Sequence, residues 1–184
     1  MGEHAVVDNL AGTTETAVIV PVPAADAVVG PYRQASDHSA VWGVPAHVTV
    51  LYPFLAPERI TAAVIDELDE VLARTGSFEC VFSRVAWFGR DVVWLAPDPA
   101  GPFRALTERV WRRFPECPPY GGAQPEVVPH LTIGSTRRAG TAALERAAAE
   151  VGAMLPIAAG IDRVRLIAGS SSPGSWRTVA EFAV

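Results

Sequence analysis

The sequence predicts an α+β protein in which two antiparallel sheets face each other across a central cleft, with helices on their outer sides. Two observations predict this class. Strand-like runs alternate along the chain with amphipathic helical stretches. The order motif strand, helix, strand, strand also occurs twice, at about residues 47–97 and again at residues 130–184. A repeated order of this kind predicts a bilobal molecule whose halves are related by a pseudo-twofold axis.

The elements can be placed in order along the chain. Runs rich in β-branched and aromatic residues predict strands at residues 16–22, 47–54, 78–89, 91–97, 130–136, 161–169 and 176–184. Apolar residues at helical spacing predict helices at residues 57–76, 102–114 and 141–154. The Pro- and Gly-rich segment 115–129 predicts a loop. Residues 23–45 predict only a short helix near residues 25–29, followed by a loop.

The length and composition agree with one compact domain. The chain has 184 residues, 49% of them hydrophobic, which is enough to bury a sizeable core without disulfides or metals. We expect residues 1–15 to form a flexible tail and residues 16–184 to form a single bilobal domain, which we expect to be a monomer. The formal net charge of −5 argues against extensive binding of duplex nucleic acid, because such binding needs many cationic contacts.

The use of cations and cysteines narrows the chemistry further. All 15 cations are arginine, which excludes a Schiff-base lysine and leaves arginine as the strong phosphate ligand. The two cysteines, Cys80 and Cys117, have a spacing that is typical of no metal or redox motif. The sequence shows neither a signal-like N-terminal pattern nor a long apolar stretch. We therefore expect a cytoplasmic protein with no membrane span.

A short motif occurs twice. Residues 47–50 read His-Val-Thr-Val, and residues 130–133 read His-Leu-Thr-Ile. Side chains alternate between the two faces of a strand. His47 and Thr49 therefore share one face, as do His130 and Thr132, while the apolar residues between them anchor each strand to a core. Two facing lobes would bring two imidazoles and two hydroxyls into one volume.

This set of groups fits the cleavage of a phosphodiester. In-line displacement at phosphorus needs a base for the attacking oxygen and an acid for the leaving oxygen, and histidine can serve either purpose near neutral pH. Threonine hydroxyls can donate hydrogen bonds to the non-bridging oxygens. A single His-x-Thr is usually structural, but two copies in the same order favour function. The sequence predicts catalytic His47 and His130 and phosphate-binding Thr49 and Thr132, with no metal and no cofactor.

These residues carry a resemblance to the 2H phosphoesterase superfamily, which includes the bacterial 2′-5′ RNA ligase and cyclic phosphodiesterase proteins. The signature of that superfamily is two His-x-[Thr/Ser]-x motifs, and the flanking sequences "PAHVTVLYPF" and "PPYGGAQPEVVPHLTI" also resemble a bacterial branch of it. The resemblance covers roughly residues 16–184. It implies the 2H fold, histidines as acid and base, and threonines as phosphate ligands.

The same resemblance implies an activity and a class of partner. Members of the superfamily cleave 2′,3′-cyclic phosphates, 2′-5′ linkages or RNA 3′ ends, and some ligate RNA. It therefore implies a metal-independent phosphodiesterase acting on a nucleotide or on the phosphodiester at an RNA end.

Several residues outside the motifs are candidates for substrate binding. Trp42, Tyr52 and Tyr120 can stack on a base, although core packing explains Trp42 equally well and is favoured for Tyr52. Tyr120 is the better candidate because its glycine-containing loop leads directly to the second motif.

Four arginines are further candidates for phosphate binding. Arg137 and Arg138 follow the second motif and can bind phosphate or remain solvated. Arg165 and Arg177 lie on the closing strands, where one of them can line the cleft.

Three alternative functions stay open. His38 or an acidic residue could join the motif histidines as the third ligand of a zinc ion. A non-catalytic nucleotide-binding or RNA-binding module would keep the histidines as phosphate ligands. An enzyme acting on a phosphodiester other than RNA would use the same groups, and the acidic net charge favours a small substrate.

Overall fold

A computed structural model describes residues 10–123 and 126–184 of the chain. Within these residues the strands are β1 (Glu15–Pro21), β2 (His47–Leu51), β3 (Phe78–Phe88), β4 (Val92–Asp98), β5 (Leu131–Ser135), β6 (Ile157–Ile161), β7 (Arg163–Gly169) and β8 (Arg177–Ala183). The helices there are α2 (Pro23–Ser36), α3 (His38–Val41), α4 (Ala62–Leu72), α5 (Gly101–Arg113) and α6 (Thr141–Ala153), with short 3₁₀ segments η1 (Pro57–Arg59) and η2 (Pro119–Gly122).

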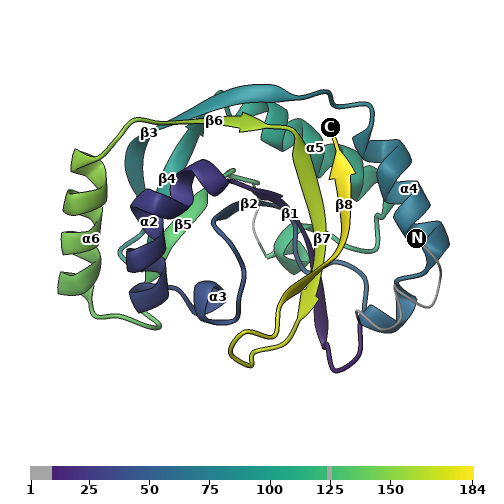
Figure 1. Ribbon diagram of the computed structural model, residues 1–184, viewed down its shortest axis with the longest axis horizontal. Coiled ribbons are helices and arrows are strands. Elements are labelled where there is room, and N and C mark those ends of the chain that lie inside the picture. Colours follow the sequence, from purple (N-terminus) through teal and green to yellow (C-terminus); the bar gives the residue numbers. More distant parts are fainter. Residues whose placement is uncertain (1–9, 124–125) are drawn as a thin grey trace.

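The predicted α+β class is confirmed. The strands of the described residues form two four-stranded sheets, with the orders β2-β1-β7-β8 and β5-β4-β3-β6. Every neighbouring pair in both sheets is antiparallel. Helices α2 and α6 cover the sheet that contains β5, whereas α4 and α5 cover the sheet that contains β2, as Figure 1 shows.

The internal repeat begins one strand earlier than the sequence pattern indicates. Each motif strand lies at the edge of its sheet, beside the strand that precedes it in the chain. The matching units are β1-α2-β2-α4 and β4-α5-β5-α6. The predicted halves, 47–97 and 130–184, do not form separate sheets, because β3 and β4 join the sheet of the second motif while β7 and β8 join that of the first.

The first helix was largely missed from the sequence. Residues 23–36 form one helix of 14 residues, although Pro31 lies inside it and would be expected to break it. Its buried stripe consists of Ala25, Val29, Arg33 and Ser36. Two of these four residues are polar, so the apolar periodicity that normally reveals a helix was absent. Strand β6 was missed for a related reason: its Ala- and Gly-rich segment has low intrinsic strand preference.

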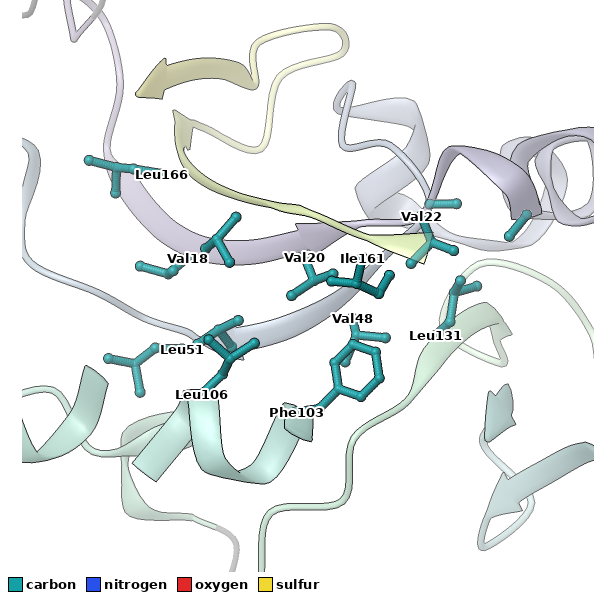
Figure 2. Packing of buried hydrophobic residues seen from close by; sticks show 14 of the residues in the cluster. Val18, Val20, Val22, Val48, Leu51, Phe103, Leu106, Leu131, Ile161 and Leu166 are labelled. Atoms are coloured by element: carbon teal, nitrogen blue, oxygen red, sulfur yellow. The ribbon is translucent and has the colours of Figure 1, made fainter. Parts of the chain in front are cut away.

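The two sheets share one core because each crossing helix packs on the other sheet. Helix α2 follows β1 but packs against β5, and α5 follows β4 but packs against β2. Figure 2 shows Phe103 and Leu106 of α5 facing Val48 and Leu51 of β2. All four of these side chains are at most 2% exposed. The lobes are therefore held together by a continuous apolar interior.

The described structure begins within the predicted N-terminal tail. The tail was predicted for residues 1–15, of which residues 1–9 lie outside the described residues. Leu10 begins a turn and packs partly against the core, and β1 begins at Glu15. No helix in the described part of the chain is both long enough and apolar enough to cross a bilayer.

The contact between α2 and β5 can be tested at Gly134. A methyl group at this position would approach the Cβ of Ser36 to 2.5 Å and the Cδ2 of Leu144 to 2.9 Å. Because the Cβ of Ser36 is fixed to the backbone of α2, the helix would have to shift. We expect Gly134→Ala to lower the free energy of unfolding by about 1–3 kcal/mol in urea denaturation.

The matched control is Gly30→Ala in α2, where an added methyl group meets nothing within 4 Å. This change should leave the free energy of unfolding unchanged or raise it by about 0.5–1 kcal/mol, because alanine is the better helix former. Equal stability of the two variants would contradict close contact between α2 and β5.

Candidate active site

The two motif strands place four polar side chains on the site face. His47 opens β2, and His130 immediately precedes β5. The apolar residues of the motifs are buried in the common core, at most 3% exposed: Val48, Val50, Leu131 and Ile133. His47, Thr49, His130 and Thr132 alternate with them and are half-buried. Because β2 and β5 lie side by side, both motifs border the same region.

The two imidazoles are held in the same way. The Nδ1 of His47 lies 2.8 Å from the carbonyl oxygen of Pro45, and the Nδ1 of His130 lies 2.7 Å from that of Val128. In both motifs the acceptor is two residues before the histidine. A carbonyl can only accept, so Nδ1 carries the proton and donates. In the neutral ring, Nε2 is then the basic nitrogen, and it is the atom through which each imidazole can exchange a proton.

Burial lowers the pKa of both histidines. For His47, desolvation and then the positive charge of Arg33 lower the pKa to about 4, against smaller raising contributions from the Pro45 carbonyl and Asp37. For His130, desolvation lowers the pKa and the Val128 carbonyl opposes it. A depressed pKa means that the folded protein favours the neutral form of His47. The stabilisation that comes from keeping His47 neutral is therefore fully present above pH 6.5 and is lost as the pH falls toward 4.

The two rings also interact with each other. A positive charge on His130 lowers the pKa of His47, which places both imidazoles in one electrostatic site. Their protonation is therefore coupled, and each apparent pKa belongs in part to the pair.

Aromatic side chains surround His130. Phe88 meets the imidazole edge-on at 4.9 Å between ring centroids, and Trp94 lies at 5.8 Å. Trp94 is opposite Thr132 in the pairing of β4 with β5, so its side chain projects to the same face as Thr132. Its Nε1 is buried and has no hydrogen-bond partner among the residues that the structure describes. These rings pack around an imidazole whose pKa is lowered by burial.

Tyr120 connects the two motifs. Its ring stacks on His130 at 6.4 Å, and its hydroxyl interacts with the hydroxyl of Thr49. Its backbone is left-handed, with φ 51° and ψ 34°, an uncommon conformation for a residue other than glycine. The Tyr120 N–H donates to the carbonyl of Tyr52 at 2.7 Å, which ties the 115–129 loop to the end of β2. Among the residues proposed for base stacking, Tyr120 is thus the one in contact with motif side chains.

A buried ion pair near His47 had not been identified from the sequence. Arg33 is 3% exposed and Asp37 is 8% exposed. The Nη2 of Arg33 donates to Asp37 Oδ2 at 2.9 Å and to Ser39 Oγ at 3.0 Å, and Ser39 Oγ donates to Asp37 Oδ2 at 2.7 Å. The carbonyl of Ser39 accepts from the N–H of Val44 at 2.9 Å, within the loop that ends at His47. The only sequence signal for this pair was the spacing of four residues between Arg33 and Asp37. On a helix, that spacing usually marks an exposed ion pair.

Trp42, Tyr52, Arg137 and Arg138 make other contacts. Trp42 stacks on His38 at 5.7 Å and packs with Tyr52 against a small apolar cluster, while the Tyr52 hydroxyl donates to Glu15 at 3.2 Å. Arg137 and Arg138 are exposed, on the turn after β5. Because a strand rises about 3.3 Å per residue, β5 separates the backbone of these two arginines from that of His130.

The residues do not provide a zinc site of the kind considered from the sequence. No group of three His, Cys, Asp or Glu side chains within residues 10–123 and 126–184 is placed to hold a metal ion. The Nε2 of His38 lies 3.4 Å from the carbonyl of Arg137 and so does not join the motif histidines as a third ligand. The donor set at the site is two imidazoles and two hydroxyls.

The influence of Arg33 on His47 can be measured directly. In Arg33→Gln the pKa of His47 should rise from about 4, because the cation that disfavours the imidazolium is gone. In Asp37→Asn it should fall further. The double variant should show a net rise, because the contribution of Arg33 is larger than that of Asp37. NMR titration of the imidazole Cε1–H signals gives these values.

The internal control is His130, whose pKa has no contribution from Arg33 and should move little in all three variants. Removing one partner of a buried ion pair costs about 3–5 kcal/mol, so the double variant is the better-folded comparison. An unchanged His47 pKa in that variant would contradict the assignment.

Comparison with known proteins identifies the family and the fold. Residues 20–172 match the family model of the 2′-5′ RNA ligase superfamily. A comparison with curated protein sequences finds no match. The fold of E. coli LigT complexed with 3′-AMP is similar, with a TM-score of 0.55 at 18% identity, over 94% of this chain and 98% of that chain.

Two further solved structures share the fold. E. coli LigT complexed with phosphate has a TM-score of 0.56 at 17% identity, over 95% of this chain and 99% of that chain. A structure described as a phosphoesterase gives a TM-score of 0.56 at 17% identity, over 94% of this chain and 98% of that chain. The structural likeness establishes the fold, and the match of the family model over most of the chain establishes the family. The chain therefore belongs to the 2′-5′ RNA ligase superfamily and is a phosphoesterase of the two-histidine type.

Proposed function

We propose that the protein is a metal-independent phosphodiesterase that opens a 2′,3′-cyclic or 2′-5′ phosphodiester of a nucleotide or an RNA end. One observation carries this proposal: both motif histidines donate from Nδ1 to a backbone carbonyl, which leaves two Nε2 atoms for proton transfer in one site. LigT, which has the same fold, is known in complex with 3′-AMP, and this supports a nucleotide as the substrate.

The electrostatics favour His47 as the base and His130 as the acid. The pKa of His47 is lowered by burial and additionally by Arg33, whereas the pKa of His130 is lowered by burial without a contribution from Arg33. On acidification His130 should thus take up a proton before His47 does. The reactive form of the enzyme then has a neutral His47 and a protonated His130, the pairing that in-line displacement requires.

The proposed steps balance in protons. The Nε2 of His47 takes a proton from water as the water oxygen forms a bond to phosphorus. The bond from phosphorus to the 2′ or 3′ oxygen breaks, and that oxygen takes the proton from Nε2 of His130. The product is a phosphomonoester and a free hydroxyl. The two histidines end with their protonation exchanged and return to the starting state through solvent.

The threonines and Tyr120 complete the proposed site. Thr49 and Thr132 donate hydrogen bonds to the non-bridging oxygens, where the transition state concentrates negative charge. Thr49 interacts with the Tyr120 hydroxyl, so a phosphate oxygen would take the place of that contact or share it. The Tyr120 ring, which stacks on His130, is then close enough to the phosphate to contact the attached nucleoside.

Removal of either imidazole should reduce turnover strongly. We expect His47→Ala and His130→Ala each to lower kcat on 2′,3′-cyclic AMP by roughly 10²–10⁴, the usual contribution of a general acid or base. The double variant should lose much less than the product of the two, because the pair acts as a unit. Wild-type turnover should persist in EDTA, since the proton transfers need no metal-bound water.

His38→Ala is the matched control, because His38 is a half-buried histidine outside the motifs. It should keep wild-type kcat. Loss of wild-type activity in EDTA with recovery in zinc would replace this mechanism by a metal-dependent one. Nucleotide binding without turnover in the wild type would instead support a non-catalytic binding module.

The pH dependence should be bell-shaped with an optimum on the acidic side of neutral. In kcat/KM the acidic limb should reflect protonation of His47, whose pKa is about 4. The alkaline limb should reflect deprotonation of His130, whose pKa is lowered from its ordinary value of 6.5. Stopped-time assays in a mixed buffer from pH 3.5 to 8 check the profile. A rate that still rises between pH 6.5 and 8 would contradict the assignment of His130 as the acid.

A further inference from the structure

A row of paired residues links the first motif to an arginine on the same sheet face. Backbone pairing places Thr49 opposite Ile19, Ile19 opposite Arg165, and Arg165 opposite Glu181. Directly opposite residues of antiparallel strands project to the same face. Arg165 therefore shares the face of Thr49, two strands away, or about 10 Å at the usual spacing of strands.

The burial of the flanking residues agrees with this orientation. Val164 and Leu166, on either side of Arg165, are fully buried in the main core, while the side chain of Arg165 is 32% exposed. Ile19 belongs to the small apolar cluster on the opposite side of the sheet from that core. The Arg165 side chain thus lies on the site face.

A cavity of about 230 Å³ lies on this face, next to the first motif. Val44, Ile167 and Trp176 form its apolar walls, and Arg165, Arg177 and Thr178 supply polar groups. Pro45 also lines the cavity, and its carbonyl oxygen is the one that holds Nδ1 of His47. The loop that lines the cavity therefore also holds the imidazole of His47.

The local charge favours an anion. Glu181 accepts from Nε of Arg165 at 2.6 Å and lies 3.8 Å from Nε of Arg163, so one carboxylate serves two guanidinium groups. In this group of described residues two guanidinium groups face one carboxylate, on a chain whose formal net charge is −5. A guanidinium beside a hydroxyl and an apolar wall is the combination that binds a phosphate ester, with its oxygens on the arginine and its carbon side against the wall.

We propose that this cavity binds the 5′-phosphate of the nucleotide whose cyclic or terminal phosphate lies between the two motif histidines. In a nucleotide with a 2′,3′-cyclic phosphate, the 5′ oxygen is the one remaining ribose position that can carry a phosphate. An anion site next to His47 is placed to receive that group. The inference rests on the proposed function and narrows it: the enzyme favours 5′-phosphorylated nucleotides or RNA ends over nucleosides with a single phosphate.

Binding measurements can test this subsite without turnover. Isothermal titration calorimetry compares adenosine 3′,5′-bisphosphate with 3′-AMP, which differ by one phosphate. The wild type should bind the bisphosphate about tenfold more tightly, as expected for a charge-assisted contact. Arg165→Gln should abolish most of this preference while the Kd for 3′-AMP changes less than about twofold.

Two further variants keep the test independent of folding. Glu181→Gln removes the carboxylate that competes for Arg165, so it should tighten bisphosphate binding by several-fold, a gain that loss of structure cannot mimic. Arg112→Gln removes an exposed arginine of α5, paired with Glu108, and should leave both affinities unchanged. Thermal unfolding confirms that each variant is folded.

The outcomes separate this inference from the proposed function. Equal affinity of the wild type for the two ligands, or binding of neither, would overturn the subsite whether or not 2′,3′-cyclic AMP is hydrolysed. An unchanged preference in Arg165→Gln together with no tightening in Glu181→Gln would overturn it as well. A bisphosphate preference that these variants alter, in a protein that hydrolyses no cyclic nucleotide, would support the subsite and contradict the proposed reaction alone.

Discussion

The structure depends on the burial of alternate residues in two edge strands. Val48 and Val50 of β2 and Leu131 and Ile133 of β5 enter one continuous core. A shift of either strand by one residue would bury the motif's polar side chains and expose its apolar ones. The position of the four polar motif side chains is thus fixed by the hydrophobic effect acting on their neighbours, which is far stronger than any contact that the polar groups make with each other.

The exchange of helices between sheets makes that core continuous. Because α2 packs on β5 and α5 packs on β2, neither lobe can complete its interior alone. The relative position of the motif strands is therefore a property of the whole fold and not of a flexible hinge. The proposed mechanism needs such rigidity, because in it an acid and a base must both reach one phosphate.

The two halves are similar in architecture but different in electrostatics. Helices α2 and α5 occupy matching places in the repeat, yet the buried stripe of α2 contains Arg33, whereas that of α5 contains Phe103, Leu106, Thr107 and Val110. The buried guanidinium acts on His47 and has no counterpart on the corresponding face of α5. Two nearly equivalent histidines can thereby take opposite roles under the proposed mechanism, because one of them is held neutral more strongly than the other.

The sequence by itself determined the fold class and most of the strands and helices, and it predicted that the polar and apolar residues of the two motifs face opposite ways. Those predictions rest on local patterns, namely the alternation of apolar and polar residues and the repeat of His-x-Thr in the same order. The length of α2, the exchange of strands between the halves and the presence of β6 were decided by tertiary structure. The α2 segment becomes one helix because Ala25, Val29 and the ion-paired Arg33 are buried together, which no local pattern reveals. The neighbours of His130 and the arginine-lined cavity beside Pro45 likewise come from strands distant in sequence. Pairing between such strands depends on how the whole chain closes its core, and a single sequence does not specify that contact by contact.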